Sequence, residues 1–166
     1  MQAILPSGQK SLSNYLPELK ARLRIDHDAD DARLVRLIDQ SRDFVQAVTC
    51  RLLTQEDVVF ISDYREFCLD TISIPYAPIA AVSGINILKD DQTLGDSVAF
   101  SFGNDQLFFT QGAPSDRLYI QTACGYGSPP SALIEEVLRL AQVMYESPTA
   151  PLQASAAVNP YILYNV

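Results

Sequence analysis

Apolar residues recur at two different spacings along this chain, and the spacing changes twice. Over residues 15–50 and again over 130–146 they return every three or four positions, which is typical of amphipathic helices. Over residues 55–124, short β-branched and aromatic runs alternate with turn-forming residues, which is typical of strands. The pattern predicts an α+β fold: a small bundle of three helices with an antiparallel β unit inserted between the second and the third. Turns this short cannot hold parallel crossovers.

Three helices are predicted, over residues 15–24, 30–50 and 130–146. The first carries Pro17 in its first turn, where proline is tolerated. The second follows an acidic loop, and Asp28 or Asp30 is expected to cap its first turn, where negative charge also suits the helix dipole. The third is bounded by prolines on both sides. Each helix has one apolar stripe, so the three are expected to pack on one another.

The β region, residues 55–124, is predicted to contain about five to seven short strands. The runs that predict them cover residues 58–61, 67–69, 71–74, 82–88, 98–102, 107–110 and 117–124. Residues 1–12 are polar, carry Pro6 and Gly8, and are expected to form an extended arm. Gly125 and Gly127 follow the last strand and predict a hinge into the third helix, because glycine turns where a Cβ would clash.

One domain is predicted over residues 1–147, because the length of 166 residues suits a single domain and no internal repeat is present. Residues 148–157 are rich in Pro, Ala and Ser, which indicates a linker. Beyond this linker the chain is expected to form an extended tail over the rest of residues 148–166, and its end is apolar and aromatic again. The tail residues singled out are Val158, Asn159, Pro160, Tyr161, Ile162, Leu163 and Tyr164. From the residues alone two arrangements stay open: the tail folds back on its own domain, or it docks on a neighbouring protein.

Composition narrows the class of protein. Nearly half of the residues, 48%, are apolar, which is typical of a globular chain. The sequence predicts no secretory signal and no membrane-spanning segment, so we expect a soluble protein made in a cytoplasm. The net charge of −8 is uneven: residues 1–54 hold eight Lys/Arg against seven Asp/Glu, and residues 55–166 hold four against thirteen. Acidic surfaces repel phosphate, which disfavours tight binding of nucleic acid.

No catalytic constellation is recognised, and we predict no catalysis, no cofactor and no metal. The one histidine, His27, lies in the acidic loop. With a single histidine and no metal-ligand cluster, the chain lacks residues that most hydrolase mechanisms need. The Asp26-x-Asp28-x-Asp30 spacing invites comparison with a calcium loop, but Asp31 and Leu37 stand where such a loop needs glycine and glutamate. The paired carboxylates Glu135-Glu136 and Asp90-Asp91 are expected to be solvated. Cys50, Cys68 and Cys124 are far apart, which favours free thiols over a zinc or redox site.

Several short motifs follow one another in a definite order. They are Leu23-Arg24-Ile25-Asp26, the set Ile74, Pro75, Pro78 and Ile79, the turn Gly125-Tyr126-Gly127 with Pro129 or Pro130, and the late Tyr145-Glu146 and Pro160-Tyr161. Their order across about residues 14–166 resembles the head–tail connector proteins (head-completion or portal adaptors) of tailed bacteriophages and gene transfer agents. This chain lacks the arginines that the family places after its late Trp/Tyr-Glu-Asn and Pro-Tyr motifs.

The resemblance implies a structural part of the virion, located at the head–tail interface after assembly in the host cytoplasm. It implies that copies form a ring, typically twelvefold, under the portal protein. Such a ring extends the channel for double-stranded DNA without sequence-specific binding and presents a platform for stopper or tail proteins. It also implies that the C-terminal segment, with Val158 to Tyr164, docks on the portal. The alternatives are another neck component, either a stopper or a tail-completion protein, or a small ligand-binding or enzymatic α+β domain.

Overall fold

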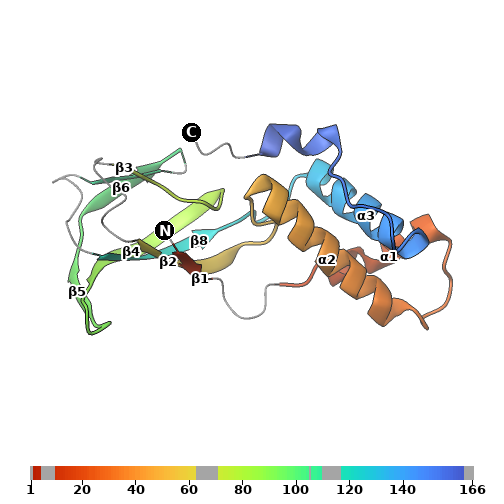
Figure 1. Ribbon diagram of the computed structural model, residues 1–166, viewed down its shortest axis with the longest axis horizontal. Coiled ribbons are helices and arrows are strands. Elements are labelled where there is room, and N and C mark those ends of the chain that lie inside the picture. The colour runs from red at the N-terminus through yellow and green to blue at the C-terminus, as the bar shows by residue number, and fades with distance from the viewer. Residues whose placement is uncertain (1, 5–9, 63–70, 105, 110–116, 163–166) are drawn as a thin grey trace. The chain divides into compact units, whose positions relative to one another are not determined.

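The computed structural model describes residues 2–4, 10–62, 71–104, 106–109 and 117–162. It confirms the α+β fold, with helices and antiparallel sheets, and groups the chain into two compact units (Figure 1). The β unit consists of Met1–Gln9 and Thr54–Gly127, and the helical unit consists of Lys10–Leu53 and Ser128–Val166. The β unit is thus an insertion between two stretches of the helical unit. The single domain over residues 1–147 stays a prediction.

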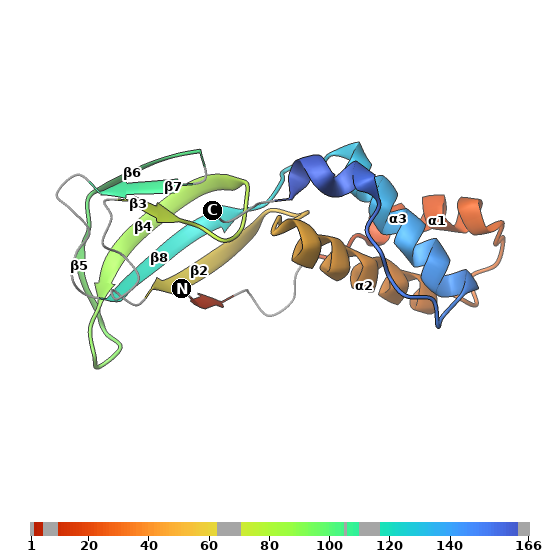
Figure 2. The same ribbon diagram turned by 45° about the horizontal axis from the view of Figure 1, so that its top comes forward.

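The helical unit contains the three predicted helices, each within one residue of its expected bounds. They are α1 (Leu16–Leu23), α2 (Asp31–Thr49) and α3 (Ser131–Glu146), and two short 3-10 helices, η1 (Ser13–Tyr15) and η3 (Ala156–Tyr161), accompany them. All three α-helices pack on one another, and the α2–α3 contact is the most extensive (Figures 1 and 2). Arg24 and Cys50 end α1 and α2 in the left-handed conformation, with φ of 57° and 53°.

The core of this unit is the set of apolar stripes that the sequence predicts. Leu34 and Ile38 on α2 and Leu133 and Leu138 on α3 are at most 1% exposed. Burial of such a side chain stabilises the fold by roughly 1.5–3 kcal/mol. One cation is also buried on α2: the Arg42 guanidinium donates to the carbonyl of Lys10 over 2.9 Å and pairs with two carboxylates of its own helix.

The β unit contains two antiparallel sheets. The larger has the order β1 (Gln2–Ile4), β2 (Glu56–Ser62), β8 (Arg117–Cys124), β4 (Ile79–Leu88), β5 (Leu94–Ser97), and the smaller has the order β3 (Thr71–Ser73), β7 (Gln106–Phe109), β6 (Phe100–Gly103). Two of these strands were not predicted, since β1 lies in the expected arm and β5 lies between two predicted strands, in residues to which no strand was assigned. The predicted run 67–69 lies outside the described residues.

Apolar side chains fill the space between the two sheets. Phe60, Ile120 and Ile85 stand opposite one another on adjacent strands of the larger sheet, and each is at most 1% exposed. In the smaller sheet, Ile72 and Leu107 stand opposite each other and are fully buried. Both views show the smaller sheet lying over a face of the larger one (Figures 1 and 2). These rows place the core of the unit between two layers of strands.

The predicted glycine hinge is present at the end of β8. Gly125 has φ of 106°, a conformation that side chains with a Cβ rarely adopt. Its N–H donates to the carbonyl of Pro78 over 2.8 Å, which fixes the turn. The hinge is therefore a structural feature of the β unit.

Candidate functional site

The C-terminal segment is the candidate site from the sequence, and the structure describes it through Ile162. Residues Ala156–Tyr161 form the 3-10 helix η3, which packs on α3 and α2. Val158 is 1% exposed, Asn159 and Pro160 are exposed, and Tyr161 and Ile162 are half-buried. Leu163 and Tyr164 lie outside the described residues. The structure therefore differs from the expected extended tail, because the segment folds back on its own helical unit as far as Ile162.

A buried carboxylate explains why the segment folds back. Glu136 is 3% exposed, and its two oxygens accept four hydrogen bonds. Ser155 donates from its backbone N–H over 2.8 Å and from its hydroxyl over 2.8 Å. Arg139 donates from Nε over 2.9 Å and from Nη2 over 2.7 Å. Arg139 Nη2 also donates to the carbonyl of Gln153 over 2.7 Å. We call these four residues, Glu136, Arg139, Gln153 and Ser155, the C-terminal clamp.

The charges of the clamp are set by this geometry. Burial acts to raise the pKa of Glu136, but the Arg139 guanidinium and the two Ser155 donors outweigh it and hold that pKa below its ordinary value of 4.5. The pKa of Arg139 is raised, chiefly by its hydrogen bonds to Glu136. Both groups are therefore charged at neutral pH. A buried ionised carboxylate needs such donors, since leaving it unpaired would carry a large desolvation cost.

A second anchor holds the far end of the segment. Arg51, just beyond α2, donates from Nε to the carbonyl of Tyr161 over 2.6 Å. Val158, between the two anchors, inserts its side chain among the helices and is almost fully buried. The segment is thus tied at Gln153 and Ser155, packed at Val158, and tied again at Tyr161. This arrangement fixes the position of the segment on the helical unit through Ile162.

The clamp was not predicted from the sequence. The expectation that both Glu135 and Glu136 are solvated is wrong for Glu136. Glu135 is exposed and pairs with Arg22 over 2.7 Å, whereas Glu136 faces the interior. One signal could have shown this: Glu136 lies three residues after Leu133, one before Val137 and four before Leu140, so it falls on the buried stripe of α3.

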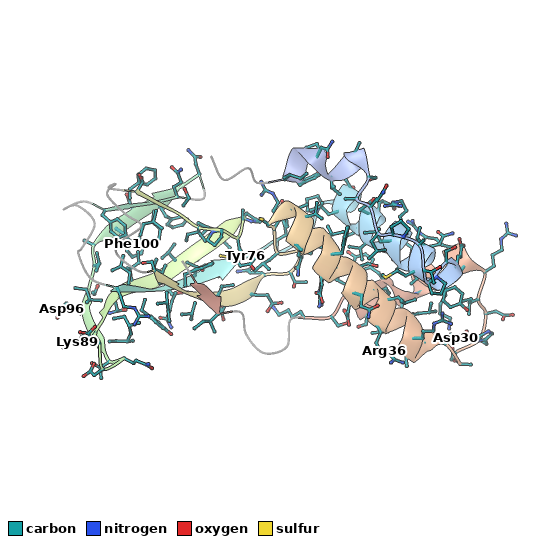
Figure 3. All side chains as sticks on the ribbon, viewed as in Figure 1. Asp30, Arg36, Tyr76, Lys89, Asp96 and Phe100 are labelled. Atoms are coloured by element: carbon teal, nitrogen blue, oxygen red, sulfur yellow. The ribbon has the colours of Figure 1, made fainter. Side chains whose placement is uncertain are left out.

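The acidic loop before α2 is held by hydrogen bonds. Lys20 Nζ donates to Asp28 over 2.7 Å and to Asp31 over 2.8 Å. The bond from Lys20 lowers the pKa of Asp28, and the two carboxylates raise the pKa of Lys20. Asp30 occupies the N-cap position but makes no capping hydrogen bond with its side chain. It accepts instead from the Tyr145 hydroxyl on α3 over 3.2 Å, and Figure 3 labels the position of Asp30 before α2.

Other candidate groups take structural positions. His27 is exposed on the acidic loop, and no group of three or more metal-binding side chains occurs among the described residues. Asp91 accepts from the N–H and the hydroxyl of Thr93, which lowers the pKa of Asp91 and closes the turn between β4 and β5. An open hollow of about 210 Å³ lies on the β unit, and its lining contains one charged residue, Asp57. No helix in the described part of the chain has the length and apolar character to cross a bilayer.

Comparisons with known proteins agree with this architecture. Residues 13–97, just over half of the 166 residues, match the family model for the phage gp6-like head-tail connector protein. No curated protein sequence matches the chain significantly. A chain from the neck of an empty GTA particle, computed with C6 symmetry, has the same fold, with a TM-score of 0.83 at 18% identity over 100% of this chain and 97% of that one.

Two further solved structures share the fold. A chain from the virion of a native gene transfer agent (GTA) particle gives a TM-score of 0.81 at 18% identity, covering 100% of this chain and 97% of that one. A chain from the neck of a native GTA particle, computed with C12 symmetry, gives a TM-score of 0.74 at 18% identity, covering 98% and 97%. The likeness therefore extends over both units and the C-terminal segment through Ile162.

Proposed function

The chain belongs to the phage gp6-like head–tail connector family, and from that membership we propose that its copies form a closed ring under the portal of a phage-like particle. As a member of this family, the chain is a structural part of the neck that joins head and tail. The match over residues 13–97 is the observation that carries the proposal. We propose that the ring continues the DNA channel and offers the attachment surface for stopper or tail proteins, and that the chain itself catalyses no reaction.

Cyclic symmetry supports the ring. Two of the solved structures that share this fold come from particle necks computed with C6 and C12 symmetry. A ring of identical subunits needs a heterologous contact, in which one surface of a copy meets a different surface of the next copy. The ring closes when the repeated rotation between copies adds up to a full turn. We propose twelve copies, in keeping with the twelvefold rings expected of the family.

The charge distribution supports a channel that lets DNA pass without holding it. The sequence of the β unit contains three Lys/Arg against ten Asp/Glu, whereas that of the helical unit contains nine against ten. Tight binding of a duplex requires lysine and arginine contacts to phosphates, which release counterions. An acidic β unit offers few such contacts, so a duplex beside it would slide without sequence-specific binding.

The C-terminal segment is the part that we propose to dock on the portal. Val158 belongs to the core of its own subunit. Among the tail residues singled out from the sequence, it therefore anchors the segment to the helical unit. Asn159 and Pro160 are exposed, and we propose that they and the residues that follow contact the partner. The clamp and Arg51 would then present the docking residues at a fixed position, which lowers the entropy cost of binding.

A truncation tests the docking step. A variant that ends at Ile162 keeps Val158, the clamp and the Arg51 contact, so it should remain folded. We expect it to be missing from particles, while the full chain is incorporated. A truncation before Val158 serves as a control for folding, because it also removes a buried side chain. Normal incorporation of the variant ending at Ile162 would show that the terminal residues are dispensable.

A further inference from the structure

The edge of the smaller sheet at β6 is an apolar surface that no further strand covers in the described part of the subunit. Within β6, Phe102 stands opposite Leu107 of β7, and Leu107 stands opposite Ile72 of β3. Side chains directly opposite on adjacent strands share a face of the sheet. Ile72 and Leu107 are fully buried, but Phe102, at the end of the same row, is 45% exposed. The row of apolar side chains therefore extends from the buried core at Ile72 and Leu107 to the partly exposed Phe102 at the edge of the sheet.

The backbone of β6 pairs on one side only, as far as the described strands extend. In the order β3-β7-β6, β6 is an edge strand, and no further strand pairs with it among the described residues. The strand begins at Phe100, which Figure 3 labels. Its sequence, Phe100–Gly103, contains neither lysine nor proline, which proteins commonly use to block an edge. The space beside Gly103 is open, because a Cβ atom added there would lie more than 4 Å from the neighbouring heavy atoms. Glycine weakens a strand and often marks the close approach of another backbone.

The charge pattern indicates which partner fits this edge. The β unit holds ten Asp/Glu against three Lys/Arg, so two copies of it repel each other. None of the residues in β3, β6 and β7 is charged. This sheet is therefore a part of the unit at which two acidic copies can meet without the strands themselves placing like charges in contact.

We propose that the edge of β6 pairs with the β3 edge of the next copy, so that the small sheets join into one sheet around the ring. This inference rests on the proposed ring and identifies a contact that would build it. Pairing of β6 with β6 would be two-fold symmetric and would stop at a dimer, whereas β6 with β3 is heterologous and continues. The added strand would cover Phe102 and satisfy the free backbone groups of the edge.

Charge substitution at the edge tests the contact. Phe102→Lys places a blocking cation on β6, and because the side chain is already 45% exposed, the subunit should fold with an unchanged melting temperature. Leu94→Lys is the matched control, since Leu94 is 53% exposed on β5, an edge strand of the other sheet. We expect Phe102→Lys to lower incorporation into particles at least about tenfold, the loss typical of a buried aromatic anchor. Leu94→Lys should be incorporated like the unchanged chain.

Cysteine cross-linking tests the pairing of the two strands. Ser101 on β6 and Ser73 on β3 are exposed and lie on the same face, because they stand opposite or beside Phe108 and Gln106 of β7. In particles that carry Ser101→Cys with Ser73→Cys, oxidation should give a ladder of dimers, trimers and larger species. Either single variant should give no ladder beyond that of the unchanged chain.

The outcomes separate this inference from the ring itself. If the unchanged chain forms no ring in particles, the proposed function fails. If the ring is present but Phe102→Lys is incorporated normally, or the double cysteine variant gives no ladder, the edge contact is wrong and the ring stands. A ladder that stops at the dimer, or a cross-link from Ser101→Cys to a different protein, would also overturn the pairing of β6 with β3.

Discussion

Replacing Glu136 with glutamine tests the reason why the C-terminal segment folds back. The substitution keeps the size of the side chain but removes its charge. Glutamine can accept through one oxygen only, and its amide group would face the donors of Arg139 or Ser155. We therefore expect the clamp to open while the helices stay folded, because Val158 and Arg51 still hold part of the segment.

The magnitude follows from the four hydrogen bonds. Bonds to a charged group contribute about 1.5–3 kcal/mol each when buried. The pair with Arg139 contributes less, about 1 kcal/mol or below, because the Arg139 side chain is 43% exposed. The two bonds from Ser155 to the buried carboxylate carry most of the effect. Allowing for the oxygen that glutamine retains, the free energy of opening should fall by about 2 kcal/mol, which is a factor of about 30 in the opening equilibrium.

Amide hydrogen exchange measures this opening directly, because the Ser155 N–H is one of the donors. Exchange at Ser155 should accelerate by about 30-fold in Glu136→Gln, within the range of local opening reactions. Glu135→Gln is the matched control, since Glu135 is 58% exposed and pairs with Arg22 at the surface. That variant should cost less than about 1 kcal/mol and leave exchange at Ser155 unchanged. Equal exchange in the two variants would refute the role of the clamp.

The same group predicts a pH dependence. The folded pKa of Glu136 lies below its ordinary value of 4.5, so the folded state favours the ionised form. Its stabilisation is complete above that ordinary value and is lost as the pH falls through the lowered folded value. Protection of Ser155 should therefore decrease on acidification below pH 4.5 in the unchanged chain. In Glu136→Gln this part of the pH dependence should be absent.

Four further substitutions test the packing of each unit by chemical denaturation. Val158→Ala should lower the free energy of unfolding of the helical unit by about 1.5–3 kcal/mol, because two buried methyl groups are lost. An unchanged free energy of unfolding would mean that η3 is not packed on the helices. Phe60→Ala should cost about 3–5 kcal/mol in the β unit, whereas Phe108→Ala, 39% exposed, should cost less than about 1 kcal/mol. Tyr145→Phe removes the bond to Asp30 and should lower the free energy of unfolding of the helical unit. A stabilised variant would contradict the contact.

The sequence predicts the helices well because the features that define each helix lie within that helix or directly beside it in the sequence. The period of apolar residues, the acidic loop before α2 and the prolines around α3 are local, and the bounds agree within one residue. The strands β1 and β5 were missed because their sequences, Gln-Ala-Ile and Leu-Gly-Asp-Ser, have no run of β-forming residues. They are strands because β2 and β4 pair with them, which is a tertiary effect.

The C-terminal segment shows a different limit of sequence reasoning. Its Pro, Ala and Ser content indicates a linker, and composition alone could not reveal that Ser155 meets a carboxylate 19 residues earlier. The polar partner of a buried group depends on how the helices pack, which no local pattern specifies. The buried position of Glu136 on the α3 stripe was the one available signal. Docking of Val158 to Tyr164 on the portal stays a prediction.

The central claim is that this chain is a ring-forming connector in the neck of a phage-like particle. A cryo-EM map of the neck, from particles produced by cells that carry this sequence, tests it most directly. We expect a closed ring of copies of this chain under the portal, with each C-terminal segment leaving its helical unit after Ile162 to contact the portal. A neck map in which this chain is absent, or present without cyclic symmetry, would contradict the account.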